Sequence, residues 1–161
     1  MWRGANGPTD RVFASLVYLL PLATALGYGE SLIEQFAFLQ PLALVIAPFT
    51  VFTDNPFGSI LVFILLIAFV INNPKVSHFI RYNVMQAFLL MVIVWLLNLL
   101  FFRFFGQILG SFDAFRMFIQ VISNTIFLGI FGACGFSIFQ SAVGRYAEIP
   151  ALSDVVYTQV R

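Results

Sequence analysis

Long stretches without a charged side chain most constrain how this chain folds. Each is close to the roughly 20 residues of helix needed to cross about 30 Å of hydrocarbon. Three of these stretches are strongly apolar and uninterrupted, the second contains prolines, and the first is short and broken by Pro21. The five uncharged stretches are residues 12–29, 35–53, 55–74, 82–102 and 117–144.

The composition excludes an ordinary soluble domain. Of 161 residues, 61% are hydrophobic and 9% are charged, whereas about a quarter of a typical soluble domain is charged. A soluble fold of this size cannot bury so much apolar surface and still be wetted by water, but lipid can cover that surface. The fold class predicted is therefore all-α, a polytopic membrane helical bundle forming one integral domain over residues 1–161.

The arginines and lysines select among topologies, because they favour the cytoplasmic side of a membrane. If all five stretches cross, four of these residues lie on each side of the membrane, and the count favours neither orientation. If the first stretch returns without crossing, they divide six to two, with only Arg103 and Arg116 on the far side. The other six are Arg3, Arg11, Lys75, Arg81, Arg145 and Arg161.

We therefore expect four transmembrane helices, with both termini cytosolic or stromal. The first apolar stretch, residues 11–29, is predicted to be interfacial or re-entrant, and residues 145–161 form a tail outside the bilayer. The expected spans are about 35–53, 56–73, 80–103 and 116–143.

Turn residues support these boundaries. Asp54 or Asn55 can cap a helix whose first position suits Pro56. The residue before Pro74 leaves the helical region, which ends the second span. Ser77 can cap a helix that begins near His78.

Five amide side chains fall inside the predicted third and fourth spans. A lone amide is costly in hydrocarbon, so each should face protein or water. Interhelical hydrogen bonds are the favoured interpretation, and the lining of a polar path is the alternative. The five residues are Asn83, Gln86, Asn98, Gln120 and Asn124.

The entrance of the third span carries a second group of polar residues. His78, Arg81 and Tyr82 fall within its first helical turn. Arginine can extend to headgroups and tyrosine suits the membrane interface, so these three are predicted to anchor the boundary.

The fourth span carries small residues four apart, at Gly129, Ala133, Ser137 and Ser141. Small side chains on one face let another helix approach closely in lipid. A packing seam within the protein is favoured, and a homo-oligomer contact or a groove for a passing segment is the alternative.

Residues suited to catalysis or metal binding are sparse in the apolar stretches. His78 is the single histidine and has no acidic or cysteine partner at metal-ligand spacing, and Cys134 is the single cysteine. No nucleophile with an adjacent base is visible. We expect no enzyme activity, no metal and no cofactor, and the net charge of +1 gives no reason to expect nucleic acid.

Three stretches carry a resemblance to a known family. They are SHFIRYNVMQAFLL at 77–90, NTIFLGIFGACGFSIFQSAVGRYAEIP at 124–150 and DRVFASLVYLLPLATALGYG at 10–29. With the spacing between them, the chain resembles the twenty-kilodalton multi-spanning subunit of the translocon at the inner chloroplast envelope, together with its cyanobacterial relatives.

This resemblance implies four spans with both termini stromal or cytosolic, in the plastid inner envelope or a cyanobacterial inner or plasma membrane. It implies a non-catalytic role in guiding or conducting polypeptides, with other translocon subunits, the translocating polypeptide and lipid as partners, within a homo- or hetero-oligomer. Plant members carry a long transit peptide that this chain does not show, which favours a cyanobacterial or plastid-encoded member. A structural scaffold or assembly factor is the alternative. A solute transporter is less favoured, because inverted repeats and buried charges are not visible.

Overall fold

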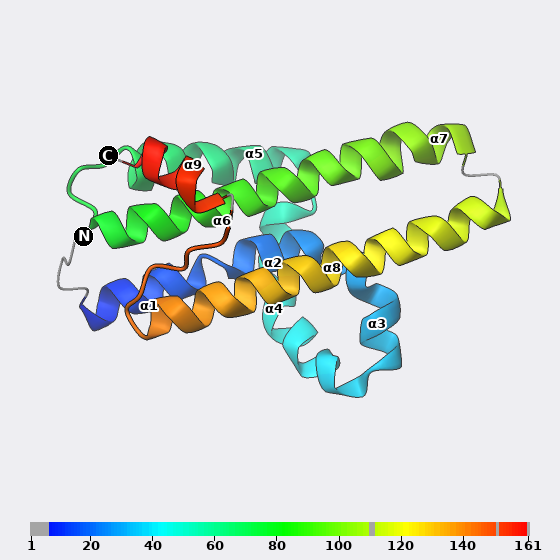
Figure 1. The fold of residues 1–161 in the computed structure, drawn as a ribbon, viewed down its shortest axis with the longest axis horizontal. Coiled ribbons are helices and arrows are strands. Elements are labelled where there is room, and N and C mark those ends of the chain that lie inside the picture. Colours follow the sequence, from blue (N-terminus) through cyan, green and yellow to red (C-terminus); the bar gives the residue numbers. More distant parts are fainter. Residues whose placement is uncertain (1–6, 110–111, 151, 161) are drawn as a thin grey trace.

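The computed structural model describes residues 7–109, 112–150 and 152–160. Within these ranges every regular element is a helix, and the long helices run side by side along one axis (Figure 1). The fold is thus an all-α helical bundle. Arg3 and Arg161, two of the cations counted above, lie outside the described residues.

Two long helices form the frame of the bundle. Helix α6 (His78–Leu97) continues through the π-helix η4 (Asn98–Phe105) into α7 (Gly106–Leu109), and α8 (Asp113–Ala142) returns beside it. Both are long and apolar enough to cross a membrane. The Ser77 hydroxyl accepts a hydrogen bond from the Ile80 amide at 3.4 Å, so the predicted cap of α6 is confirmed.

The N-terminal segment of the bundle is built from short helical elements. It comprises α1 (Pro8–Leu16), α2 (Leu19–Leu26), the 3₁₀ turn η1 (Gly27–Gly29) and α3 (Glu30–Gln35). Residues 8–35 together are long and apolar enough for a span, and they pack against α6 and α8 inside the bundle. The sequence interpretation placed residues 11–29 at the interface or in a re-entrant loop.

The break between α1 and α2 has a local cause. Pro21 has no amide hydrogen, so it cannot donate to the carbonyl of Val17, four residues earlier. That carbonyl instead accepts from the Leu20 amide at 3.2 Å, in a tighter turn. The segment nevertheless continues along the bundle, because Tyr18 and Ala25 are fully buried against neighbouring helices.

A sharp corner joins the next two helices. Helix α4 (Gln40–Thr53), which follows the 3₁₀ turn η2 (Ala37–Leu39), meets α5 (Pro56–Leu65) and its π-helical extension η3 (Leu66–Ile71) at 92°. The Asn55 side chain accepts from the amides of Phe57 and Gly58 at 2.8 and 3.1 Å. The predicted cap at Asn55 is confirmed.

This corner bears on the number of crossings. The sequence interpretation treated residues 35–53 and 56–73 as two spans. By length and composition, the described residues contain three helices that could cross a membrane, or four if the bent pair counts as one span, and the two separate spans stay a prediction.

The C-terminal segment folds back onto the start of α6. Helix α9 (Leu152–Gln159) packs there, and Val156 and Val160 bury Tyr82. The start of α1 and helix α9 lie at the same end of the bundle (Figure 1).

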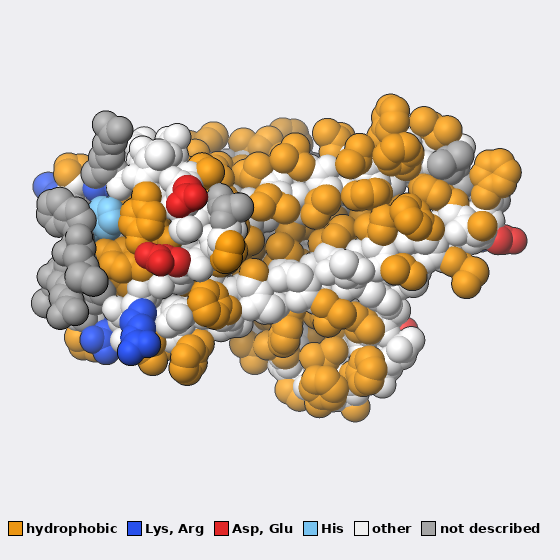
Figure 2. Space-filling view, in the orientation of Figure 1, with side chains coloured by type: hydrophobic (Ala, Val, Ile, Leu, Met, Phe, Trp, Pro, Cys, Tyr) orange, Lys and Arg blue, Asp and Glu red, His pale blue; other side chains and the backbone are white. Residues whose placement is uncertain are grey.

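The surface separates apolar from charged side chains. Hydrophobic side chains cover most of the shaft of the bundle, and the basic residues visible in this view gather at the end that holds α9 (Figure 2). Large apolar side chains of α4 and α5 point outward, including Leu44 and Phe57, which are 76% and 83% exposed. A surface of this kind is stable when lipid covers it.

Gly29 fixes how closely the N-terminal segment approaches α8. A Cβ atom at this position would lie 2.5 Å from the Phe127 ring. Gly29→Ala should therefore destabilise the protein by about 1–3 kcal/mol, the usual cost of overpacking. The measurement is thermal unfolding in detergent, followed by gel filtration.

Gly27→Ala is the matched control, because a Cβ atom there meets nothing within 4 Å. Equal stability of the two variants would contradict a close contact between Gly29 and α8.

Candidate functional site

Asn83 is the centre of a buried hydrogen-bond cluster. Its side chain is fully buried and its carbonyl oxygen accepts from the hydroxyls of Tyr18 and Ser141, each at 2.9 Å. Its amide nitrogen donates to the backbone carbonyl of Phe79 at 2.8 Å. One side chain of α6 thus ties the N-terminal segment to α8.

Gln86 lies one turn further along α6 and is also fully buried. Its amide nitrogen donates to the Ser137 hydroxyl of α8 at 3.4 Å. Within the described residues its carbonyl oxygen has no hydrogen-bond partner, and neither does the Tyr82 hydroxyl. These are the two buried side-chain polar atoms in the described structure that have no hydrogen-bond partner in the protein.

The other three amides lie nearer the opposite end of the bundle. Asn98 donates to the hydroxyl of Tyr28. Ser31 of α3 donates to the Asn124 carbonyl oxygen at 2.8 Å and accepts from the Gln120 amide at 2.7 Å. Gln120 also donates to Asn124 at 3.3 Å.

Together these contacts form what we call the amide seam, the hydrogen bonds between five amides and hydroxyls on other helices. Four of the five amides bond to the N-terminal segment, through Tyr18, Tyr28 and Ser31. Such bonds satisfy groups that would be costly in lipid. The geometry fits the interhelical interpretation, while the lining of a path stays a prediction.

Sequence reasoning did not select these three hydroxyl residues. Tyr18 and Tyr28 lie in residues 11–29, which were predicted to be interfacial or re-entrant, and Ser31 lies in the link that follows this stretch. One feature of the sequence could have predicted these partners. The N-terminal apolar stretch carries hydroxyl side chains along its length, while the strongly apolar stretches carry amides that need hydrogen-bond partners.

The predicted anchors contact protein at the start of α6. His78 binds the Tyr146 hydroxyl through Nδ1 and the Val160 carbonyl through Nε2, each at 3.1 Å. A carbonyl can only accept, so the network assigns the hydrogen to Nε2 and the acceptor role to Nδ1. Arg81 Nε donates to the Ile71 carbonyl at 2.7 Å, which ties α6 to η3.

Aromatic rings complete the contact between α6 and the C-terminal segment. Tyr82 lies 4.9 Å, between ring centroids, from both Tyr146 and Tyr157. The Tyr157 hydroxyl donates to Glu148 at 2.8 Å. Burial, followed by this carboxylate, raises the pKa of Tyr157 to about 12, and burial also raises the pKa of Tyr146. His78 and Tyr82 thus also hold the tail and Arg81 contacts η3, while the anchoring role of all three in lipid stays a prediction.

The small-residue face of α8 divides into an inner and an outer part. Ser137 and Ser141 are fully buried and bond to α6, and Ala133 is half-buried. Gly129 is exposed, and a Cβ atom there would meet nothing within 4 Å. In the described structure, Gly129 therefore does not pack closely against another helix.

Groups suited to chemistry stay apart in the fold. Cys134 is buried and free. Across residues 7–109, 112–150 and 152–160, no three histidine, cysteine, aspartate or glutamate side chains come close enough to hold a metal ion.

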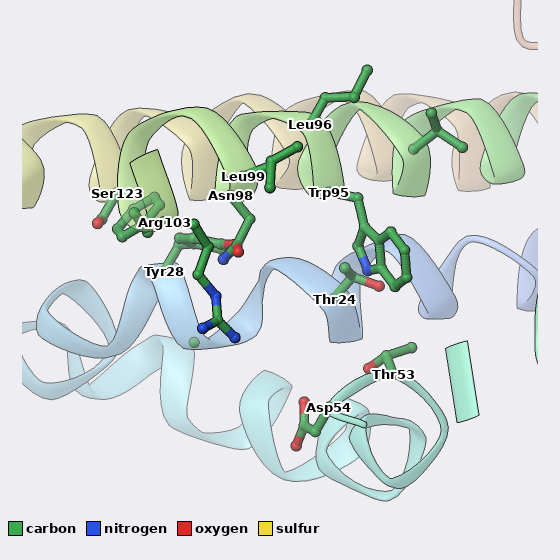
Figure 3. Close-up of a pocket in the computed structure, with 13 residues that line it drawn as sticks. Thr24, Tyr28, Thr53, Asp54, Trp95, Leu96, Asn98, Leu99, Arg103 and Ser123 are labelled. Carbon is green, nitrogen blue, oxygen red and sulfur yellow. The ribbon is translucent and has the colours of Figure 1, made fainter. Parts of the chain in front are cut away.

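A pocket of about 770 Å³ opens between η1, the corner of α4 and α5, and the α6–η4 helix (Figure 3). Its wall includes the Asn98–Tyr28 pair of the amide seam. Arg103 and Asp54 enter it from different helices, and Trp95 forms part of its wall. Arg103 and Asp54 are both exposed residues, so the pocket is lined in part by charged side chains at the surface of the bundle.

Comparison with known proteins decides the family. Residues 9–156 match the family model described as chloroplast import apparatus Tic20-like. The chain belongs to the Tic20 family. The predicted resemblance is confirmed.

Relatives of the Tic20 family align along nearly the whole chain. A Tic20 family protein of Synechocystis sp. is 41% identical over 94% of this chain and 93% of its own length. The Tic20 family protein Ycf60 of Gracilaria tenuistipitata var. liui is 30% identical over 94% of this chain and 75% of its own. Protein TIC 20-v, chloroplastic, of Arabidopsis thaliana is 27% identical over 94% and 71%.

The bond between Tyr18 and Asn83 can be measured by a double-mutant cycle. Tyr18→Phe and Asn83→Leu each remove one partner, and the double variant removes both. We expect a coupling free energy of about 0.6–1.7 kcal/mol, the range found for interhelical hydrogen bonds in membranes. The measurement is reversible unfolding in mixed micelles.

Thr125→Val paired with Asn83→Leu is the control, because in the described part of the chain the Thr125 hydroxyl donates within its own helix, to the Val121 carbonyl. A coupling no larger than that of this control would show that the Tyr18–Asn83 contact does not stabilise the bundle.

Proposed function

We propose that this chain is a non-catalytic component of a machinery that moves proteins across the plastid inner envelope or a cyanobacterial membrane. The observation that carries the proposal is the match of residues 9–156 to a family described as chloroplast import apparatus. Two of the similar Arabidopsis proteins are named TIC 20 and chloroplastic. The polytopic helical fold supports a role within the bilayer.

We further propose a membrane arrangement that includes the N-terminal segment. The four crossings are residues 8–35, the bent pair α4–α5 as one broken span, α6 with η4, and α8. Cations divide six to two in this arrangement as well, with Arg103 and Arg116 on the far side. Both termini then lie on the cytosolic or stromal side, in agreement with the placement of α9 and the start of α1 at one end.

A path for a polypeptide needs more than one copy of this fold. The amides of α6 and α8 are occupied by hydroxyls of the same chain, so they support packing in the isolated subunit. We propose that the path is formed with other translocon subunits or further copies, and that energy comes from a partner.

The bonding of these amides to hydroxyls of the same chain also favours a second function, a scaffold or assembly factor with no conducting role. In that case the amide seam only holds helices together. The two functions differ in whether a translocating polypeptide contacts this subunit.

Site-specific photocrosslinking separates the two functions. A photoreactive residue is placed at Asn124, in the seam, while a tagged precursor is arrested during translocation. A translocation role predicts adducts between this subunit and the precursor, and purification in mild detergent should recover translocation components with it.

Leu128 is the matched control position, because it lies one turn further along α8 and is 55% exposed on the apolar surface. Adducts with lipid alone from both positions, and recovery of no translocation component, would support the scaffold and contradict the translocation role.

A further inference from the structure

The pocket between η1, the α4–α5 corner and the α6–η4 helix combines two kinds of surface. Arg103, Asp54 and Thr24 supply charge and hydrogen-bonding groups (Figure 3). Leu96 and Leu99 belong to the same wall and are 60% and 62% exposed, so they continue onto the lipid-facing surface. A pocket of this kind matches a molecule with a polar head and an apolar body.

The two charges in this pocket face a common space without pairing. Figure 3 shows the Arg103 guanidinium and the Asp54 carboxylate entering it from different helices. In the part of the chain that the structure describes, neither group forms an ion pair. A charge within a membrane segment is costly and marks a functional position unless a partner compensates it.

Arg103 places one edge of the pocket at the level of headgroups. Arg103 follows Arg81 by 22 residues on one continuous helix, or roughly 33 Å at 1.5 Å per residue. This length is close to the hydrocarbon thickness of about 30 Å. If Arg81 lies at one boundary, Arg103 lies at the other, where phosphate groups are found.

We propose that this pocket binds the headgroup of an anionic, hydroxylated phospholipid of the bilayer, of the phosphatidylglycerol type. Arg103 binds the phosphate, because a guanidinium forms strong charge-assisted bonds to phosphate oxygens. Asp54 accepts hydrogen bonds from the headgroup hydroxyls, and Thr24 also lines the pocket. The acyl chains follow Leu96 and Leu99 into the surrounding lipid.

Asp54 decides between headgroups. Its carboxylate would repel a bare phosphate monoester, whereas hydroxyls can donate to it and offset that repulsion. A choline headgroup offers no hydrogen-bond donor at all. The pocket should therefore prefer phosphatidylglycerol to both phosphatidic acid and phosphatidylcholine.

Trp95 provides a direct reporter, because it is part of the pocket wall and 38% exposed. The chain has two tryptophans, so Trp2→Phe leaves Trp95 as the single tryptophan, which is excited selectively over the tyrosines. The full chain is placed in phosphatidylcholine nanodiscs that contain a small, equal fraction of one bromine-labelled lipid. We expect brominated phosphatidylglycerol to quench Trp95 with roughly fivefold higher apparent affinity than brominated phosphatidylcholine, the factor that one cation near a membrane surface supplies.

Variants assign this preference to the two charged residues. Arg103→Gln should abolish the preference for phosphatidylglycerol and Arg103→Lys should retain it. Asp54→Ala should make phosphatidylglycerol and phosphatidic acid equal. The controls Arg116→Gln and Asp113→Ala lie outside the pocket and should show the same order of lipid preference as the unaltered chain.

Equal quenching by brominated phosphatidylglycerol and phosphatidylcholine would overturn the proposal. So would a preference that survives Arg103→Gln, or equal affinity for phosphatidylglycerol and phosphatidic acid in the unaltered chain. Gel filtration and the Trp95 emission maximum identify any variant that fails to fold, and Arg103→Lys then remains as the informative comparison.

Discussion

An amide side chain in hydrocarbon needs a hydrogen-bond partner, and the arrangement of this bundle depends on that requirement. Helix α6, its extension η4 and helix α8 carry five such amides, each bonded to a hydroxyl on another helix. Four of these amides bond to residues 8–35. At about 0.6 kcal/mol for each bond in a membrane, the four contribute about 2 kcal/mol, which is substantial for a segment that contains Pro21 and a helix break.

The seam also explains why polar residues and small residues share faces. Ser137 and Ser141 are small enough to let α6 and α8 approach, and their hydroxyls then bond to Gln86 and Asn83. Gly29 performs the same spatial role without a hydrogen bond, against Phe127. Close approach and polar pairing therefore reinforce one another, as expected for helices that cannot gain stability from the hydrophobic effect in lipid.

Much of the fold could be predicted from local chemistry. The uncharged stretches predicted a polytopic all-α bundle, and the caps at Asn55 and Ser77 follow from side chains that bond to nearby amides. The quoted motifs around residues 77–90 and 124–150 predicted the family. These features depend on residues close in sequence or on strings specific to the family.

The tertiary placement of residues 8–35 could not be predicted in the same way. Counting arginines and lysines gives six to two for two different arrangements. In one, residues 8–35 cross and the bent α4–α5 pair crosses once; in the other, residues 8–35 return and the two stretches cross separately. The partners of the amides lie between 51 and 93 residues away in sequence, so their pairing depends on packing. The pocket with Arg103 and Asp54 likewise forms only when the corner at Asn55 comes beside η4.

The central claim is that the amide seam holds residues 8–35 across the bundle, and cysteine accessibility tests it most directly. In a Cys134→Ala background, Thr9→Cys and Glu34→Cys are labelled separately with a membrane-impermeant maleimide from each side of oriented vesicles. The account predicts that the two positions react from opposite sides, and that Tyr18→Phe, Tyr28→Phe and Ser31→Ala together bring them to one side. Labelling of both positions from the same side in the otherwise unaltered chain would contradict it.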